Sequence, residues 1–253
     1  MININFTDIK AVILAGGRSK RLGGGAKALR QANGRPLLGY VLDALGFLPR
    51  ENIIIVVGYE RERVIETFPG FSYAVQEEQL GTGHAALCAE GSLAGFNGSV
   101  LVCCCDMPLV KQESYRELIE LHKSKKNDCT LLSSESDTPQ SFGRVVRSPG
   151  GDFLKITETR DCTPEELLIT ELNSGVYVFS AERLFPALRS LSRENAQGEY
   201  YLTDAPGLIK NAGGRVGIYK KELREEILGV NTPEQLAQAE RILAARRDKF
   251  NPA

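Results

Sequence analysis

The sequence lacks several features that would assign it to large classes of protein. No apolar run among its 253 residues approaches the roughly 20 residues that a membrane-spanning helix needs. The first eight residues, MININFTD, lack the basic and then apolar pattern of a secretory signal peptide. We therefore expect a cytoplasmic protein with no membrane partner.

An excess of charge of one sign is also missing. The 31 lysines and arginines nearly balance the 32 aspartates and glutamates, which gives a net charge of -1 and an isoelectric point of about 6.2. The basic residues are spread along the chain. In most nucleic-acid-binding proteins they are instead gathered in one stripe or patch. We expect no nucleic acid partner.

Metal-ligating and nucleophilic side chains are few. The two histidines, His84 and His122, give little material for a zinc site or a Ser-His triad. The six cysteines include no C-x-x-C pair, and three of them lie in VCCCD at 102–106, which has the pattern of a buried strand. We expect reduced cysteines that pack as small core residues, and histidines that are structural or exposed.

What the sequence does contain is a glycine-rich, cationic loop near its N-terminus. Residues 14–22 read LAGGRSKRL, follow the apolar run 9–14, and are followed by GGGA and Lys27. Glycines let backbone N–H groups approach an anion, and the arginines and lysines of the loop add positive charge. The segment predicts a strand that opens into a polyphosphate-binding loop.

Two familiar phosphate loops have a different spacing. A P-loop ends in Gly-Lys followed by Ser or Thr, whereas Lys27 is flanked by Ala26 and Ala28, with no hydroxyl to hold magnesium. The dinucleotide fingerprint G-x-G-x-x-G is absent, because Gly16 and Gly17 are adjacent. Taken alone, the segment also suits an exposed loop with solvated charges, so the rest of the chain has to decide.

Apolar runs alternate with helical patterns through the first half of the chain. Strands are expected at 9–14, 53–57, 71–75 and 100–104, and helices at 36–48, 61–67, 83–93 and 112–123. This alternation predicts a largely parallel sheet covered by helices. Ligands bind beyond the carboxyl ends of such strands. The glycine-rich loop, the segment after Val75 and Asp106 should therefore share one crevice.

From Cys129 onward the pattern changes to strands without long helices between them. These strands are expected at 130–133, 143–147, 153–159 and 171–179. They predict antiparallel or mixed pairing in a second, smaller lobe that walls the crevice. Helical patterns return at 181–190, 202–213 and 233–249, with short strands at 216–219 and 227–230. We expect one domain over residues 1–253, with halves of about 1–127 and 128–253.

Asp106 lies at the tip of the expected strand 100–104, just before Met107 and Pro108. A carboxylate in this position suits Mg²⁺, which takes hard oxygen ligands together with substrate phosphates and waters. An aspartate at a strand end also commonly caps a helix or shapes a turn. The pattern of residues leaves both interpretations open.

Three motifs that occur in order resemble those of the sugar-1-phosphate nucleotidyltransferases. They are the loop 14–27, QEEQLGTGHA at 76–85 and DMPL at 106–109. The resemblance is closest to the N-acetylglucosamine-1-phosphate uridylyltransferase domain of bacterial bifunctional enzymes, and continues in FGRVVR (142–147), NSGVY (173–177), NAQGEYYLTD (195–204) and GVN (229–231). It implies an α/β, Rossmann-like nucleotidyltransferase fold, with a mixed, mostly parallel sheet flanked by helices and a smaller β-rich sugar-binding lobe.

The resemblance also implies an activity: Mg²⁺-dependent transfer of a uridylyl group from UTP to N-acetylglucosamine 1-phosphate, with release of pyrophosphate. Such a reaction needs no protein nucleophile or general base, because a phosphate monoester, with a second pKa of about 6, is largely dianionic at neutral pH. It needs alignment and charge neutralisation. Alternative substrates are 1-phosphates of the glucose, galactose or mannose type, or dTTP. A non-catalytic sugar-nucleotide binder is the hypothesis from another class.

The resemblance implies roles for individual residues. Arg21, Lys27 and Asp106 would be catalytic, and Asp106 and Asn231 would bind Mg²⁺. The residues that would bind the nucleotide are Leu14, Ala15, Gly16, Gly17, Gln76, Gln79, Gly81 and Thr82. Those that would bind the sugar phosphate are Gly143, Glu158, Asn173, Tyr201 and Thr203.

The chain departs from the family pattern at several positions. Lys20 and Ala26 replace a usual threonine and proline, and Lys20 either adds a phosphate contact or points into water. Cys104 and Cys105 replace a common aromatic residue and glycine, which leaves sugar selectivity open. The bifunctional enzymes continue into a left-handed β-helix, whereas this sequence stops at Ala253. We therefore expect no acetyltransferase activity and a monomer or dimer.

Overall fold

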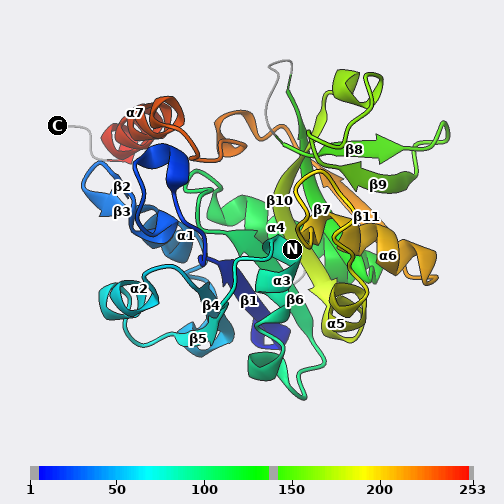
Figure 1. Cartoon of the computed structure of the whole chain (residues 1–253), viewed down its shortest axis with the longest axis horizontal. Coiled ribbons are helices and arrows are strands. Elements are labelled where there is room, and N and C mark those ends of the chain that lie inside the picture. Colours follow the sequence, from blue (N-terminus) through cyan, green and yellow to red (C-terminus); the bar gives the residue numbers. More distant parts are fainter. Residues whose placement is uncertain (1–5, 137–141, 251–253) are drawn as a thin grey trace.

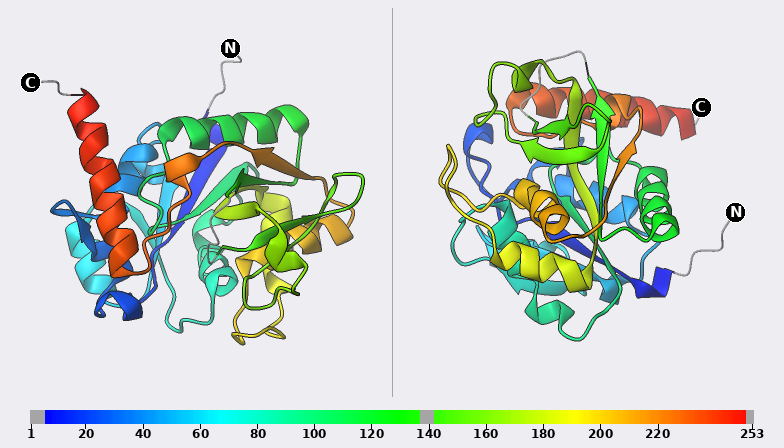
Figure 2. Two further views of the ribbon diagram at one scale, coloured as in Figure 1. Left: turned by 90° about the horizontal axis from the view of Figure 1, so that it is seen from above. Right: turned by 90° about the vertical axis from the view of Figure 1, so that its right-hand side faces the viewer.

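The computed structural model describes residues 6–136 and 142–250. Its main feature is a central sheet with helices packed on both sides (Figure 1, Figure 2). Four strands form its parallel part: β1 (Ile9–Leu14), β4 (Ile53–Val57), β5 (Ser72–Val75) and β6 (Ser99–Cys104). β1 pairs with β4 and β6, and β4 pairs with β5. The apolar runs of the sequence thus form the expected parallel strands.

The second half of the chain extends this sheet with mixed pairing. It contributes β7 (Cys129–Glu135), β8 (Arg144–Arg147), β9 (Phe153–Thr157), β10 (Glu171–Ser180) and β11 (Val216–Lys220). β10 runs antiparallel to β6 and β7, and the strand order is β11-β7-β10-β6-β1-β4-β5. β8 pairs with β10 and β9 and forms the smaller lobe. The expected Rossmann-like α/β fold is confirmed.

Seven α-helices and eight short 3₁₀ helices connect the strands of the described residues. The α-helices are α1 (Leu37–Ala44), α2 (Arg61–Thr67), α3 (Thr82–Leu87), α4 (Gln112–Lys125), α5 (Ala181–Arg189), α6 (Ala205–Asn211) and α7 (Pro233–Phe250). The 3₁₀ helices are η1 (Phe6–Asp8), η2 (Lys20–Leu22), η3 (Lys27–Leu29), η4 (Arg50–Asn52), η5 (Gly91–Leu93), η6 (Glu166–Leu168), η7 (Leu202–Asp204) and η8 (Arg224–Glu226). A separate ribbon pairs β2 (Gln31–Ala32) with β3 (Arg35–Pro36). No helix of the described ranges is long and apolar enough to cross a membrane.

The core consists of an apolar layer on each face of the sheet. Ile13 of β1 faces the layer shared with α1, α2 and α4, whereas its neighbour Leu14 faces the layer shared with α3, α5 and α6. This division follows from the alternation of side chains along a strand. A third, smaller cluster joins the start of α1 to α7 through Leu37, Val230 and Ala239. The long C-terminal helix is thereby held beside the glycine-rich loop (Figure 1).

The prediction of a strand at 227–230 is wrong. These residues are buried, but they form no strand, and the segment crosses as a loop from η8 to α7. Its apolar side chains go to different layers: Ile227 joins the layer of α4, whereas Leu228 and Val230 join the cluster beside α7. Burial therefore explains the apolar pattern without sheet pairing. The Val230 N–H donates instead to the backbone oxygen of Asp106, at 2.9 Å.

Candidate active site

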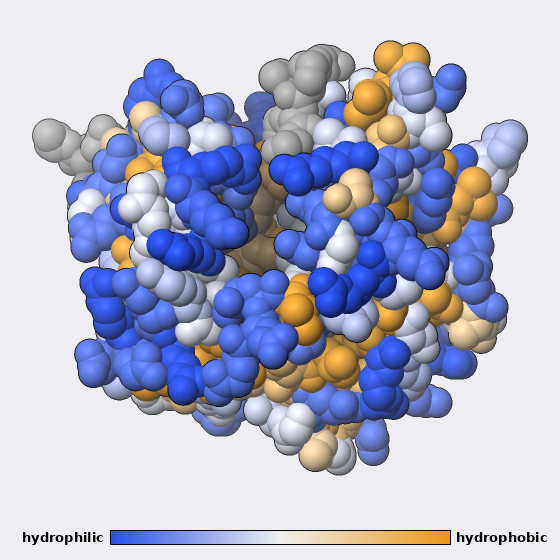
Figure 3. Space-filling view, viewed as in Figure 1, coloured by the Kyte–Doolittle hydropathy of each residue, from blue (hydrophilic) through white to orange (hydrophobic). Residues whose placement is uncertain are grey.

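Two adjoining cavities open at the carboxyl edge of the sheet. The larger, of about 580 Å³, is lined by the ends of β1 and β6, the glycine-rich loop, and the segment after β5. The smaller, of about 240 Å³, lies against β10 and the start of η7. Both share Thr82, Cys104, Asp106 and Asn231. Figure 3 shows a hollow at the centre of this face, rimmed by hydrophilic residues. The expected common crevice is therefore present.

The glycine-rich loop is folded back on itself. The Ser19 hydroxyl contacts the carbonyl oxygens of Gly24 and Gly25, at 2.7 and 2.9 Å. Gly23, Gly24 and Gly25 have φ values of 83°, 85° and 81°, a backbone conformation that residues with a Cβ rarely adopt. These contacts explain the glycine triplet, because the loop turns through three successive left-handed residues.

Lys27 is the best-buried cation of this loop. Its ammonium contacts Oδ2 of Asp106, and Oδ1 of Asn231 at 2.6 Å. Burial lowers the pKa of Lys27, but the Asp106 carboxylate more than offsets it, so the pKa is raised above 10.5 and the ammonium stays charged. Arg21 also reaches Asn231 Oδ1, at 3.4 Å. Lys20 lines the same cavity.

The oxygens around Lys27 suit a metal ion. Among the described residues no group of three or more His, Cys, Asp or Glu side chains could hold one. Mg²⁺, however, commonly takes one or two protein oxygens and completes its shell with waters and phosphates. The Asp106 carboxylate and the Asn231 amide oxygen already converge on one cation, the Lys27 ammonium. This donor set fits Mg²⁺.

The segment after β5 lines another part of the larger cavity. Gln76 is 4% exposed, and its amide nitrogen contacts the Gly81 carbonyl oxygen at 3.1 Å and Nδ1 of His84 at 3.2 Å. Its Oε1 lies so close to Gly16 that a Cβ there would be 2.9 Å away. Gly16 is therefore a position of close approach, and His84 supports Gln76.

The segments 80–83 and 200–202 lie side by side. The Tyr200 N–H donates to the Leu80 carbonyl oxygen, and the Gly83 N–H donates to the Tyr200 carbonyl oxygen, both at 2.8 Å. The Leu202 N–H donates to the Thr82 hydroxyl at 3.0 Å. Two sequence motifs separated by over a hundred residues thus pack together, and Thr82, at this junction, lines both cavities.

Polar acceptors line the smaller cavity. Glu158 accepts a hydrogen bond from the Thr203 hydroxyl at 3.0 Å, and burial raises the pKa of its carboxyl. Asn173 is 3% exposed, and its amide nitrogen donates to the Tyr177 hydroxyl at 2.7 Å. Its Oδ1 has no hydrogen-bond partner among the described residues. A buried acceptor of this kind normally has a hydrogen-bond partner, and Asn173 also lines the smaller cavity.

The structure brings nearly all of the sequence-predicted residues together. Arg21, Lys27 and Asp106 line the larger cavity, as do Leu14, Gly16, Gly17, Gln76, Gln79, Gly81, Thr82 and Asn231. Gly143, Glu158, Asn173 and Thr203 line the smaller one. Ala15 and Tyr201 line neither. Ala15 is buried in the core, and the Tyr201 hydroxyl donates to Asp161 at 3.2 Å, outside the cavities.

Other lining residues were not predicted from the sequence. Those of the larger cavity include Tyr59, Ala85 and Glu199, and those of the smaller one include Met107, Phe142, Gly175, Leu202 and Gly229. Several of these residues lie within the motifs of the sequence analysis, but roles were predicted there only for other residues of those motifs. Tyr59 carried no signal: it follows β4, and the Arg18 guanidinium lies over its ring at 4.8 Å.

Comparison with known proteins identifies the family. Residues 11–208 match the MobA-like NTP transferase domain. The chain belongs to this family. This MobA-like chain is 42% identical over 241 residues to the bifunctional protein GlmU of Pelotomaculum thermopropionicum, covering 94% of the chain and 53% of GlmU. The value is 41% over 238 residues for GlmU of Streptococcus mutans, covering 93% and 52%.

The predicted resemblance to sugar-1-phosphate nucleotidyltransferases is thus confirmed, and this MobA-like chain spans about half the length of the curated relatives. A solved structure also shares its fold. That structure, from Bacillus anthracis, is named as a proposed glucose-1-phosphate thymidylyltransferase in complex with a sucrose. It superimposes with a TM-score of 0.75 at 21% identity, and covers 92% of this chain and 94% of its own.

Substitution of Gly81 by alanine should destabilise the protein. A Cβ at Gly81 would lie 2.5 Å from the Tyr200 carbonyl oxygen, a backbone atom, and φ is +116°. We expect Gly81→Ala to lower the free energy of unfolding by about 1 to 3 kcal/mol, measured by chemical denaturation. Gly91→Ala, where a Cβ would meet nothing within 4 Å, is the matched control. Equal values for the two variants would contradict this account.

Substitution of Glu158 by glutamine should stabilise the protein relative to the wild type, and by a larger amount at higher pH. Burial raises the pKa of this carboxyl above 4.5, so the folded state holds the proton more tightly than the unfolded chain. The wild type therefore loses stability as the pH rises from 4.5 to the higher pKa of the folded state, because the Glu158 carboxyl gives up its proton. Glu158→Gln has no proton to lose at this position. The difference in free energy of unfolding should grow in favour of Glu158→Gln from pH 4.5 upward. A difference that does not change with pH would refute it.

Proposed function

We propose that this MobA-like protein transfers a uridylyl group from UTP to N-acetylglucosamine 1-phosphate in a Mg²⁺-dependent reaction. The observation that carries the proposal is the convergence of Lys27, Asp106 and Asn231 where the two cavities meet. The identity to GlmU, the bifunctional protein whose uridylyltransferase half the sequence resembles, favours this substrate pair.

The larger cavity suits a nucleoside triphosphate. Backbone of the glycine-rich loop and the cations Arg21 and Lys27 line one end, where a triphosphate needs positive charge. Gln76, Gly81 and Thr82 line the other end. Backbone and amide groups of this kind pair with the imide edge of a pyrimidine. We assign uracil to this end and the phosphates to the cationic loop.

The smaller cavity suits an N-acetyl sugar. Glu158 and the unpartnered Oδ1 of Asn173 are both hydrogen-bond acceptors; Asn173 is buried, and Glu158 is partly buried. A sugar with hydroxyl groups and an amide N–H offers the matching donors. The sugar 1-phosphate would then point toward Asp106 and Asn231, which line both cavities.

The reaction we infer is a direct displacement. An oxygen of the sugar phosphate attacks the α-phosphorus of UTP, the bond from that phosphorus to the bridging oxygen of pyrophosphate breaks, and pyrophosphate leaves with its electron pair. Lys27 and Arg21 neutralise negative charge as it develops on the phosphate oxygens. Bound Mg²⁺, held by Asp106 and Asn231, would supply further charge neutralisation at these phosphates.

A covalent route through cysteine is unfavourable here. Cys104 and Cys105 line the larger cavity, and a thiolate is the nucleophilic form of cysteine. Burial raises the pKa of Cys105 to about 12 and that of Cys104 well above its usual value. Both thiols are therefore protonated at neutral pH, in agreement with a displacement that involves no protein nucleophile.

The test is pyrophosphate release from the purified protein with Mg²⁺. UTP, dTTP, CTP, ATP and GTP are each paired with the 1-phosphates of N-acetylglucosamine, glucose, galactose and mannose. We expect the highest kcat/KM with UTP and N-acetylglucosamine 1-phosphate. A different best pair would overturn the substrate assignment and keep the reaction class. Bound UDP-sugar without release from any pair would favour a non-catalytic binder.

Variants separate the site from contaminating activity. Lys27→Ala removes a cation from the phosphates, and we expect a loss in kcat of about 100-fold to 1,000-fold, equivalent to about 2.7 to 4 kcal/mol. Asp106→Asn should also abolish most of the activity, since it weakens a hard oxygen ligand. Lys125→Ala, an exposed lysine at the end of α4, is the matched control and should retain wild-type activity.

A further inference from the structure

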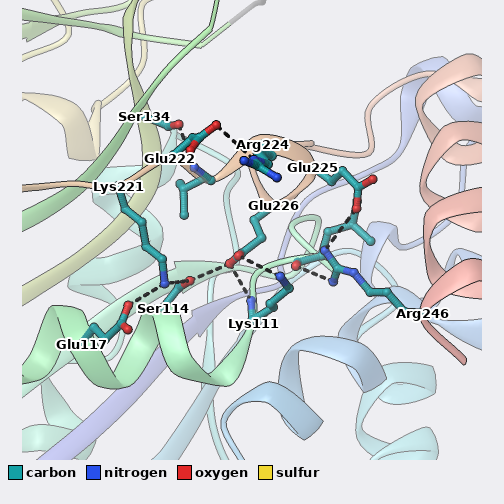
Figure 4. A network of polar contacts seen from close by, with 12 residues as sticks. Lys111, Ser114, Glu117, Ser134, Lys221, Glu222, Arg224, Glu225, Glu226 and Arg246 are labelled. Carbon is teal, nitrogen blue, oxygen red and sulfur yellow. Dashed lines mark hydrogen bonds and ion pairs between the residues drawn. The ribbon is translucent and has the colours of Figure 1, made fainter. Parts of the chain in front are cut away.

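A buried carboxylate lies behind the candidate site and contacts none of its cavities. Glu226, at the end of η8, is 4% exposed. Its Oε2 accepts hydrogen bonds from the Lys111 backbone N–H at 3.0 Å and the Ser114 hydroxyl at 2.6 Å, and its Oε1 lies 3.6 Å from the Lys111 ammonium. Figure 4 shows these contacts converging on Glu226. A buried carboxylate with this many donors is held in one place.

Glu226 supplies what the N-terminus of α4 lacks. The residue before that helix is Lys111, which makes no side-chain capping hydrogen bond. The N-terminus of a helix leaves backbone N–H groups unpaired and favours negative charge. Glu226 reaches this helix end from 115 residues further along the chain and pairs with it.

The two segments joined at Glu226 each lead to a site residue. Asp106 lies five residues before Lys111, and Asn231 lies five residues after Glu226. The segments meet again at the site, where the Val230 N–H donates to the Asp106 carbonyl oxygen at 2.9 Å. The segments 106–114 and 226–231 therefore contact each other twice, through Glu226 and through Val230. Together they form a closed frame that carries Asp106 and Asn231 at the end nearer the site.

Neighbouring contacts strengthen this frame. Arg246 of α7 donates to the Leu109 carbonyl oxygen at 2.8 Å, and Lys221 contacts both Ser114 and Glu117 of α4. On the other side of Asn231, its backbone N–H donates to Gln235 Oε1 in the first turn of α7, at 2.9 Å. The loop that carries Asn231 has no regular structure, so its position depends on these side-chain anchors.

We propose that Glu226 is a positioning residue that sets the separation of the Asn231 amide oxygen from the Asp106 carboxylate. The proposal rests on the proposed function, because it assigns these two oxygens to the metal and phosphate end of the site. Loss of the carboxylate releases the Asn231 loop from α4, which spreads the oxygens over more positions. Metal affinity falls, whereas Glu158 and Asn173, which line the smaller cavity from other elements, keep their positions.

The test compares Glu226→Gln with Glu222→Gln. Glu222 lies on the same segment but is exposed and pairs with Arg224 at the surface. We expect Glu226→Gln to raise the Mg²⁺ concentration for half-maximal pyrophosphate release by about tenfold, a larger factor than any rise in the KM for the sugar phosphate measured at saturating Mg²⁺. High Mg²⁺ should restore most of the activity. Glu222→Gln should match the wild type. A purely structural role would lower the melting temperature and kcat without moving the Mg²⁺ requirement, and would overturn the proposal.

A binding measurement keeps this test independent of turnover. Mn²⁺ is titrated into protein that holds UTP but no sugar phosphate, and the free Mn²⁺ signal is followed by electron paramagnetic resonance. The same increase of about tenfold in the Mn²⁺ dissociation constant supports the proposal, and equal constants overturn it. If the wild type releases no pyrophosphate from any pair, the proposed function fails, but the Mn²⁺ comparison still decides the role of Glu226.

A second variant covers the case in which Glu226→Gln does not fold. Ser114→Ala removes one donor to the Glu226 carboxylate and leaves the Lys111 backbone donor in place. It should raise the Mn²⁺ dissociation constant in the same direction by a smaller factor, about twofold to threefold. An unchanged constant in a folded Ser114→Ala protein would count against the proposal.

Discussion

The ammonium of Lys27 joins parts of the chain that are otherwise distant. It contacts the Asp106 carboxylate, 79 residues away, and the Asn231 amide oxygen, 204 residues away. Unpaired charges and unpaired polar groups are costly in a partly buried position, so these groups stabilise one another there. The glycine-rich loop, the end of β6 and the loop before α7 therefore have to meet for the site to exist.

The sheet makes that meeting possible by aligning strand ends. β1 and β6 are parallel neighbours, in register from Ile9 with Ser99 to Leu14 with Cys104, so the loops that follow them start at the same level. The antiparallel β10 then brings the second lobe beside β6. As a result, Asn173 and the acceptors of the smaller cavity lie next to Asp106 instead of on a separate domain.

Local sequence patterns predicted the parts of this structure whose causes are local. The apolar run 9–14 became β1, and the glycine triplet became a turn with three positive φ values. The site residues came from motif resemblance, and those of the larger cavity come together largely because three of the motifs follow the ends of β1, β5 and β6. What failed depended on distant partners. The run 227–230 is apolar because its side chains pack into two separate clusters of the core, and periodicity cannot distinguish that from a strand. Tyr201 lies in a motif, but its hydroxyl pairs with Asp161.

Glu226 is the clearest case of a residue that no local pattern could assign. In the sequence it is one of two acidic residues in LREEI, and its neighbours Arg224 and Glu225 are exposed. Its role follows from a helix that begins over a hundred residues earlier without a capping side chain. A sequence window around either segment lacks half of the interaction, so only the assembled fold reveals it.

The charge balance around Lys27 also couples the ligands of the proposed reaction. The oxygens that suit Mg²⁺ are the same ones that now pair with the ammonium. A metal ion that engages them takes these partners from Lys27, and a largely buried ammonium without partners is unfavourable. Phosphate oxygens restore them. Metal and triphosphate should therefore bind more strongly together than either does alone, because the triphosphate supplies the partners that Lys27 loses to the metal, and such coupling is reciprocal.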